Sequence, residues 1–81
     1  MVKYYVYILK SVKDGRLYKG LTTDLERRIR EHNFGKTKST KGFSPWKLIH
    51  KEEFINLSQA REREKYYKTG IGREIIKKLD P

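Results

Sequence analysis

The stretch YYVYILKSVKDGRLYKGL, residues 4–21, decides the fold of this chain of 81 residues. Positions 4–9 carry apolar or aromatic side chains on both alternating faces, which is typical of a strand covered on both sides. Asp14 and Gly15 form a turn signal, and residues 16–21 have the composition of a returning strand. The stretch therefore predicts a β-hairpin in which Tyr7 and Tyr18 lie near each other.

The residues after the hairpin predict a helix followed by an exposed basic loop. Thr23–Glu26 has the spacing of a capping box, so we expect the helix to begin there and to end near Asn33. Residues 34–45 hold glycines, lysines and hydroxyls without apolar periodicity. That composition indicates a solvent-exposed loop.

A third strand and two further helices complete the pattern. Residues 46–54 predict a strand whose side chains alternate between two faces. One face carries Trp46, Leu48 and His50, and the other carries Lys47, Ile49 and Lys51. Helices are expected from about Ser58 to Thr69, with Gly70 as the stop, and over a short segment that ends near Leu79. We therefore expect an α/β fold of the α+β type. Its small, three-stranded, mainly antiparallel sheet is flanked by helices in the order β-β-α-β-α-α.

Length and composition limit both the organisation and the partners. A chain of 81 residues has room for one core, so we expect a single domain over residues 1–81. The sequence lacks cysteine, a signal peptide and a membrane-spanning apolar run, which favours a cytoplasmic protein without disulfides, thiolate-bound zinc or a membrane partner.

The formal net charge of +10 favours nucleic acid as the partner, because such a field attracts polyanions. Acidic lipids or proteins are the alternative partners. Lysines of the predicted basic loop are expected to contact backbone phosphates, which position a substrate without reading its bases. These lysines are Lys36, Lys38 and Lys41.

Two polar residues lie on or beside the apolar stripe of the first predicted helix. At about 100° per residue, Leu25 and Ile29 define the stripe, His32 lies within it and Arg28 lies on its border. A histidine on an apolar face is more often a core residue than a catalytic one. Arg28 on the same turn shifts the interpretation toward function.

A carboxylate interrupts the apolar stripe of the second predicted helix. Glu64 lies on the face that is otherwise defined by Leu57, Ala60, Tyr67 and Ile71. Burying an unpaired carboxylate costs free energy, so Glu64 needs a cation. The pattern leaves two hypotheses equally open, an internal ion pair with Arg28 and a bound divalent metal ion.

Taken together, these motifs resemble the GIY-YIG nuclease superfamily, particularly its small stand-alone members, over nearly the whole chain. The two half-motifs are Tyr5–Tyr7 and Tyr18–Gly20, whose signature tyrosines are eleven residues apart. Arg28 and His32 match the arginine and histidine of the family's first helix. Glu64 aligns with the family's metal-binding glutamate.

The resemblance implies a metal-dependent endonuclease that hydrolyses phosphodiester bonds in DNA, with a role in DNA repair or recombination. Glu64 would hold Mg²⁺ or Mn²⁺, and Arg28 would clamp the phosphate. Tyr7 or Tyr18 would orient or deprotonate the attacking water, which requires the metal and Arg28 to lower the phenol pKa. His32 would assist proton transfer or hold a tyrosine hydroxyl.

Two departures from the family pattern keep other hypotheses open. Tyr5 stands where the family usually has glycine, and Lys19 where it usually has an aliphatic residue. Lys19 would either bind substrate phosphate or be a solvated strand position. One alternative is a non-catalytic nucleic-acid-binding module that retains the fold, and another is a protein-interaction domain. In a nuclease this small, a protein partner or a homodimer would supply substrate specificity.

Overall fold

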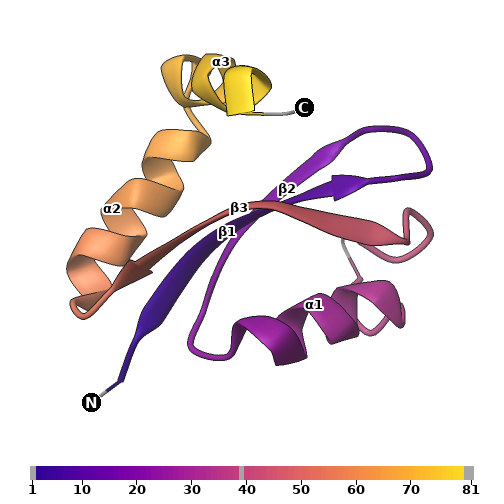
Figure 1. Ribbon diagram of the computed structural model, residues 1–81, viewed down its shortest axis with the longest axis horizontal. Coiled ribbons are helices and arrows are strands. Elements are labelled where there is room, and N and C mark those ends of the chain that lie inside the picture. The colour runs from indigo at the N-terminus through magenta and orange to yellow at the C-terminus, as the bar shows by residue number, and fades with distance from the viewer. Residues whose placement is uncertain (1, 39, 80–81) are drawn as a thin grey trace.

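The computed structural model describes residues 2–38 and 40–79, which form a three-stranded sheet and three helices (Figure 1). The elements are β1 (Tyr4–Ser11), β2 (Leu17–Thr22), α1 (Leu25–Asn33), β3 (Trp46–Phe54), α2 (Leu57–Tyr67) and α3 (Gly70–Leu79). The order β-β-α-β-α-α and the α+β class confirm the prediction from sequence.

The sheet has the strand order β2-β1-β3, and both pairs of neighbouring strands are antiparallel. The predicted hairpin is confirmed, with Tyr7 opposite Gly20 and Leu9 opposite Tyr18. The four consecutive residues Val6–Leu9 are fully or almost fully buried. Such burial on both alternating faces follows from the central place of β1, which is covered on two sides.

Helices cover the two faces of the sheet separately, with α1 on one side and α2 and α3 on the other (Figure 1). One core cluster contains Val6 and Ile8 together with Ala60, Tyr67 and Ile76 of the last two helices. The other cluster places Leu25 and Ile29 of α1 against β1. The members that form its buried centre are Tyr7, Leu9 and Trp46. The two signature tyrosines therefore belong to the α1 side of the sheet.

The predicted alternation along β3 is correct as far as Ile49 and fails at His50. Leu9 pairs with Leu48 but Ile8 pairs with His50, so Ile49 is an extra residue that forms a β-bulge. Beyond the bulge the side chains change faces. His50 consequently contacts Tyr67 of α2, on the face opposite Trp46.

The helix boundaries differ in detail from the sequence prediction. Asp24, not Thr23, is the N-cap of α1, and its side chain accepts a hydrogen bond from the backbone N–H of Arg27 at 3.2 Å. Gly70 was expected to stop the second helix, but it begins α3. No helix in residues 2–38 and 40–79 is long and apolar enough to cross a bilayer.

The loop between α1 and β3 is only partly the exposed basic loop that the sequence predicts. Its three lysines are exposed, but the side chain of Thr40 is fully buried. The indole N–H of Trp46 donates to the carbonyl of Thr40 at 3.2 Å, which folds the loop back onto the sheet. Thr40 thereby reaches the buried side of α1.

Candidate active site

A buried hydrogen-bonded series joins β1, α1 and the following loop. The hydroxyl of Tyr7 lies 3.0 Å from Nε2 of His32, which is completely buried. On the other side of the ring, Nδ1 of His32 lies 2.8 Å from Oγ1 of Thr40. The Thr40 hydroxyl in turn donates to the carbonyl of Thr37 at 3.3 Å.

We assign the tautomer of His32 from the direction of the hydrogen bond between Thr40 and Thr37. The carbonyl of Thr37 only accepts hydrogen bonds, so the hydroxyl proton of Thr40 points toward it. Oγ1 of Thr40 therefore accepts from the Nδ1–H of His32, which leaves the lone pair on Nε2 for the hydroxyl of Tyr7. Burial and the charge of Arg28 lower the pKa of His32, so the imidazole is neutral at neutral pH.

Gly20 makes room for the ring of Tyr7. A Cβ atom at this position would collide with the phenol ring and hydroxyl of Tyr7 on the neighbouring strand. Such a close approach of ring to backbone is available only to glycine. The third residue of the second half-motif thus fixes where the first signature tyrosine lies.

The phenol of Tyr7 is surrounded by groups that act on its pKa in opposite directions. Burial raises the pKa most strongly, and the nearby guanidinium of Arg28 lowers it. Tyr18 and Glu64 raise it further, and the net result is a raised pKa. Arg28 therefore acts as the sequence analysis expected, but burial outweighs it and Tyr7 is a neutral phenol at neutral pH.

Tyr18 contacts the same histidine through its ring. Its centroid lies 4.7 Å from that of His32 and 6.2 Å from that of Tyr7. The ring is only partly buried, and it packs edge-to-face with Trp46 at an interplanar angle of 66°. The two tyrosines therefore flank His32 in different ways, since Tyr7 hydrogen-bonds to it and Tyr18 packs on it.

Arg28 is oriented by a carboxylate that the sequence analysis did not single out. Its Nη1 lies 2.8 Å from Oε1 of Glu31, and the side chain is 32% exposed. Partial burial lowers the pKa of Arg28, but the hydrogen bond to Glu31 and the nearby phenol of Tyr7 outweigh this and raise it. The spacing of three residues on one helix was the available signal for Glu31. Thr40, inside an irregular loop, had no comparable signal.

Glu64 approaches this group from α2. The alternative of an ion pair with Arg28 is wrong, since Arg28 pairs with Glu31 and Glu64 with Lys68 at 3.9 Å. The side chain of Glu64 is 23% exposed, and its charge helps to raise the pKa of Tyr7. α2 packs on β1 and β2 from the opposite face of the sheet, so the carboxylate acts on the phenol through its charge.

The surroundings of Glu64 fit a divalent cation that is held by one carboxylate and completes its coordination with water and phosphate oxygens. In the described part of the chain, no three histidine, cysteine, aspartate or glutamate side chains gather into a metal-binding group. A cation would therefore rest on the Glu64 carboxylate, with water and phosphate oxygens as its other ligands. Mg²⁺ accepts this arrangement because it retains several waters and binds through one or two carboxylates.

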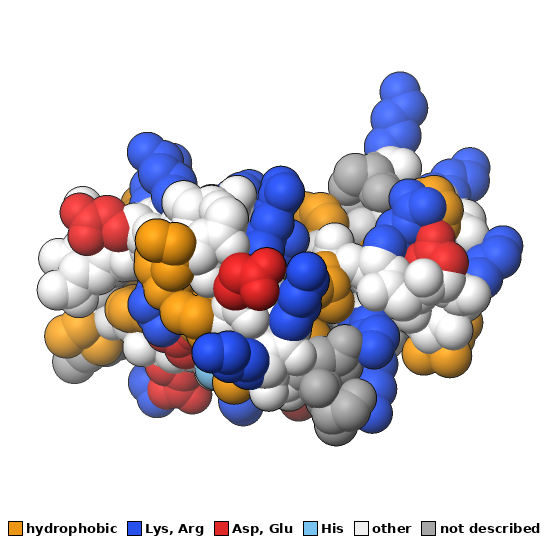
Figure 2. Space-filling model, turned by 90° about the horizontal axis from the view of Figure 1, so that it is seen from above, with side chains coloured by type: hydrophobic (Ala, Val, Ile, Leu, Met, Phe, Trp, Pro, Cys, Tyr) orange, Lys and Arg blue, Asp and Glu red, His pale blue; other side chains and the backbone are white. Residues whose placement is uncertain are grey.

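The structure does not bring the four expected phosphate-binding lysines together. The three loop lysines are exposed on the α1 side. Lys19 lies on the other face, where burial and the nearby charges of Arg73 and Lys68 lower its pKa. Basic side chains are spread widely over the face shown in Figure 2, and acidic ones are few there. The basic surface therefore extends well beyond the loop.

This chain is similar in sequence to a known family of protein domains. A family model described as the GIY-YIG catalytic domain matches residues 3–76. The match begins just before β1 and ends within α3. It includes all five residues that the sequence analysis placed in the catalytic group: Tyr7, Tyr18, Arg28, His32 and Glu64.

The relatives are proteins of similar size. The UPF0213 protein SH2523 of Staphylococcus haemolyticus is 43% identical over 81 residues, which are 99% of this chain and 98% of that protein. The UPF0213 protein CPE1444 of Clostridium perfringens is 51% identical over 65 residues, or 79% and 69% of the two chains. The solution NMR structure of the UPF0213 protein BH0048 from Bacillus halodurans has a TM-score of 0.58 and 37% identity. That likeness covers 96% of this chain and 85% of the other.

Proposed function

Because this chain belongs to the GIY-YIG family, we propose that it is a metal-dependent endonuclease that hydrolyses phosphodiester bonds in DNA. The observation that carries the proposal is the buried series from Tyr7 through His32 to Thr40, with Arg28 beside the phenol. A role in DNA repair or recombination, with a partner protein or a second copy supplying specificity, belongs to the same proposal.

Tyr7 is the tyrosine that would activate water. Its hydroxyl proton has a recipient, the Nε2 lone pair of His32, whereas Tyr18 meets the histidine only through its ring. As the phenol proton moves to Nε2, the phenol oxygen takes a proton from water, and the hydroxide formed attacks phosphorus. The resulting imidazolium keeps its Nδ1–H hydrogen bond to Thr40.

Arg28 would bind and stabilise the phosphate. Its guanidinium is held by Glu31 and remains charged, because that hydrogen bond helps to raise its pKa. A planar guanidinium presents several donors to phosphate oxygens and stabilises the negative charge that builds up there in the transition state. Arg28 also lies beside Tyr7, so the bound phosphate would lie next to the activated water.

Glu64 would hold Mg²⁺ or Mn²⁺ through its partly exposed carboxylate. Bound there, the cation would neutralise charge on the scissile phosphate and the leaving oxygen. The weak pairing of Glu64 with Lys68 at 3.9 Å supports this role, because a carboxylate bound so loosely can exchange its partner for a metal.

The test is cleavage of a panel of labelled DNAs with Mg²⁺ or Mn²⁺. We expect Arg28→Ala and Glu64→Gln each to reduce the cleavage rate by about 10²-fold or more. The matched controls are Arg61→Ala and Glu62→Gln, which alter exposed residues of α2 and should cut at the wild-type rate. Wild type that cuts none of the DNAs, or full activity in both site variants, would overturn the proposal.

A non-catalytic nucleic-acid-binding module is the second candidate, favoured by the raised pKa of Tyr7, because less of this phenol is ionised and able to take a proton from water at neutral pH. This candidate predicts binding that weakens steeply with salt and no cleavage at any metal concentration. Measuring binding and cleavage on the same DNAs separates the two functions. Binding that ignores salt would exclude both.

A further inference from the structure

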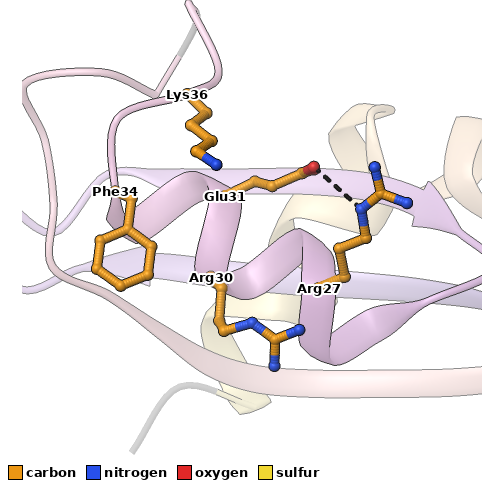
Figure 3. Close-up of a pocket in the computed structure, with 5 residues that line it drawn as sticks. All are labelled: Arg27, Arg30, Glu31, Phe34 and Lys36. Carbon is orange, nitrogen blue, oxygen red and sulfur yellow. Dashed lines mark hydrogen bonds and ion pairs between the residues drawn. The ribbon is translucent and has the colours of Figure 1, made fainter.

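A second potential binding site lies on the outer flank of α1. It is an open pocket of about 340 Å³ with five lining residues: Arg27, Arg30, Glu31, Phe34 and Lys36 (Figure 3). Three of these side chains are cations and one is an aromatic ring. The pocket shares only Glu31, the partner of Arg28, with the candidate active site.

Phe34 is unusual because its large ring is 75% exposed, whereas Phe43 and Phe54 are partly buried in the two cores. The backbone that carries it is fixed at the end of α1. Its N–H donates to the carbonyl of Arg30 at 2.9 Å, and the N–H of Lys36 donates to the carbonyl of Glu31 at 3.0 Å. An apolar ring is thus displayed to solvent on an ordered support, where a ligand gains by covering it.

The charges around Phe34 favour an anion. Arg30 and Lys36 have no carboxylate partner within residues 2–38 and 40–79. The single carboxylate of the pocket, Glu31, is already engaged, with Oε2 at 3.3 Å from Nε of Arg27 and Oε1 at 2.8 Å from Nη1 of Arg28. Figure 3 shows the guanidinium of Arg30 on the same flank of the helix as the ring.

We propose that this pocket binds an unpaired nucleotide of a nucleic-acid strand, with the base stacked on Phe34 and the flanking backbone phosphates on Arg30 and Lys36. An aromatic ring combined with cations is the chemistry by which proteins hold single-stranded nucleic acid. A base inside a duplex has both faces covered by its neighbours and offers none to the ring. The pocket therefore selects a strand with at least one unstacked base.

The position of Glu31 connects this inference to the proposed function, on which it rests. The same carboxylate holds Arg27 in the pocket and Arg28 in the candidate active site. A nucleotide stacked on Phe34 would therefore lie close along its strand to the phosphate that Arg28 binds. Substrates with an unpaired base near the scissile bond are expected to be preferred.

The test is fluorescence anisotropy of the whole protein with a short labelled single strand and with a blunt-ended duplex of two fully complementary strands, both in chelator. We expect Phe34→Leu to weaken single-strand binding about tenfold, because it retains apolar area but removes stacking. Phe34→Trp should bind the single strand at least as well as wild type. Arg30→Gln should weaken binding and reduce the dependence of binding on salt. The matched control is Arg61→Gln, at an exposed position of α2, which should bind like wild type.

Equal single-strand affinity in wild type and Phe34→Leu would overturn the inference, as would an equal loss for the single strand and the duplex. Since chelator prevents turnover, these results are independent of catalysis. If cleavage depends on Arg28 but substitution of Phe34 does not change binding, the proposed nucleotide-binding pocket is wrong and the proposed nuclease function stands. A Phe34 effect in a protein that cuts nothing overturns the proposed nuclease function alone.

Discussion

Each face of the sheet holds a buried tyrosine in contact with a histidine, and the two groups differ in what surrounds the pair. On the α1 side, Tyr7 hydrogen-bonds to His32, whose other nitrogen meets the neutral hydroxyl of Thr40. On the α2 side, Tyr67 donates to the carboxylate of Glu52. That carboxylate also lies 2.9 Å from Nε2 of His50 and 3.0 Å from Nε of Arg63.

Under the proposed function, this difference separates a proton path on the α1 side from a structural clamp on the α2 side. Burial and the hydrogen bond to Glu52 raise the pKa of Tyr67 to about 12, so its proton stays on the hydroxyl. The carboxylate is shared by three partners and joins β3 to α2. Tyr7 instead points at a neutral nitrogen that can accept its proton, and Arg28 lies beside it. A tyrosine–histidine contact alone therefore does not identify a catalytic site.

The largest expected effect comes from replacing the two histidines in turn. His32→Gln should lower the cleavage rate by about 10²- to 10⁴-fold, because it removes the acceptor for the Tyr7 proton. His50→Gln should leave the rate within about threefold of wild type, since the clamp on the α2 side takes no part in proton transfer. Single-turnover cleavage measures both. Similar losses in the two variants would remove the distinction between the faces.

A smaller effect is expected at Thr40, which acts through His32. Thr40→Val should lower the cleavage rate about tenfold, because the Nδ1–H of His32 loses the acceptor that fixes its tautomer. Thr40→Ser restores the hydroxyl and should recover most of the rate. A Ser variant as slow as the Val variant would show that packing of Thr40, and not its hydroxyl, supports activity.

The smallest effect concerns stability on the α2 side. Burial raises the pKa of Glu52, but Tyr67, His50 and Arg63 outweigh it and lower the pKa below its usual 4.5. Its stabilising contribution is therefore present above the unfolded pKa and is lost as pH falls through the folded value. Glu52→Gln should lower the free energy of unfolding by about 1 kcal/mol at neutral pH, and by less under acid conditions. Urea unfolding at several pH values checks this; a constant difference contradicts it.

The sequence predicted the regular elements well because they depend on local patterns. Alternation within residues 4–21 is sufficient to predict the hairpin, and the single turn between Arg28 and His32 is sufficient to place both on one side of α1. Glu64 likewise stands out in the sequence, because it interrupts the apolar stripe of α2. Such signals are short-range, so they are visible in a sequence without knowledge of packing.

Features that depend on contacts between distant residues were missed or wrong. Thr40 lies in an irregular loop, and only the folded chain shows that it meets His32. The bulge at Ile49 has no composition signal, so His50 was expected on the wrong face. The pKa of Tyr7 depends on how deeply the strand is covered, which outweighs the charge of Arg28. Burial is a property of the whole fold and is not encoded in a half-motif.

The most direct measurement of the central claim is the single-turnover DNA cleavage rate of Tyr7→Phe beside that of Tyr67→Phe. Each change removes one hydroxyl from a buried ring and leaves the packing in place. If the Tyr7–His32 pair carries the proton from water, Tyr7→Phe should be slower by about 10²-fold or more while Tyr67→Phe cuts at close to the wild-type rate. A Tyr7→Phe protein that cuts as fast as wild type would contradict the account.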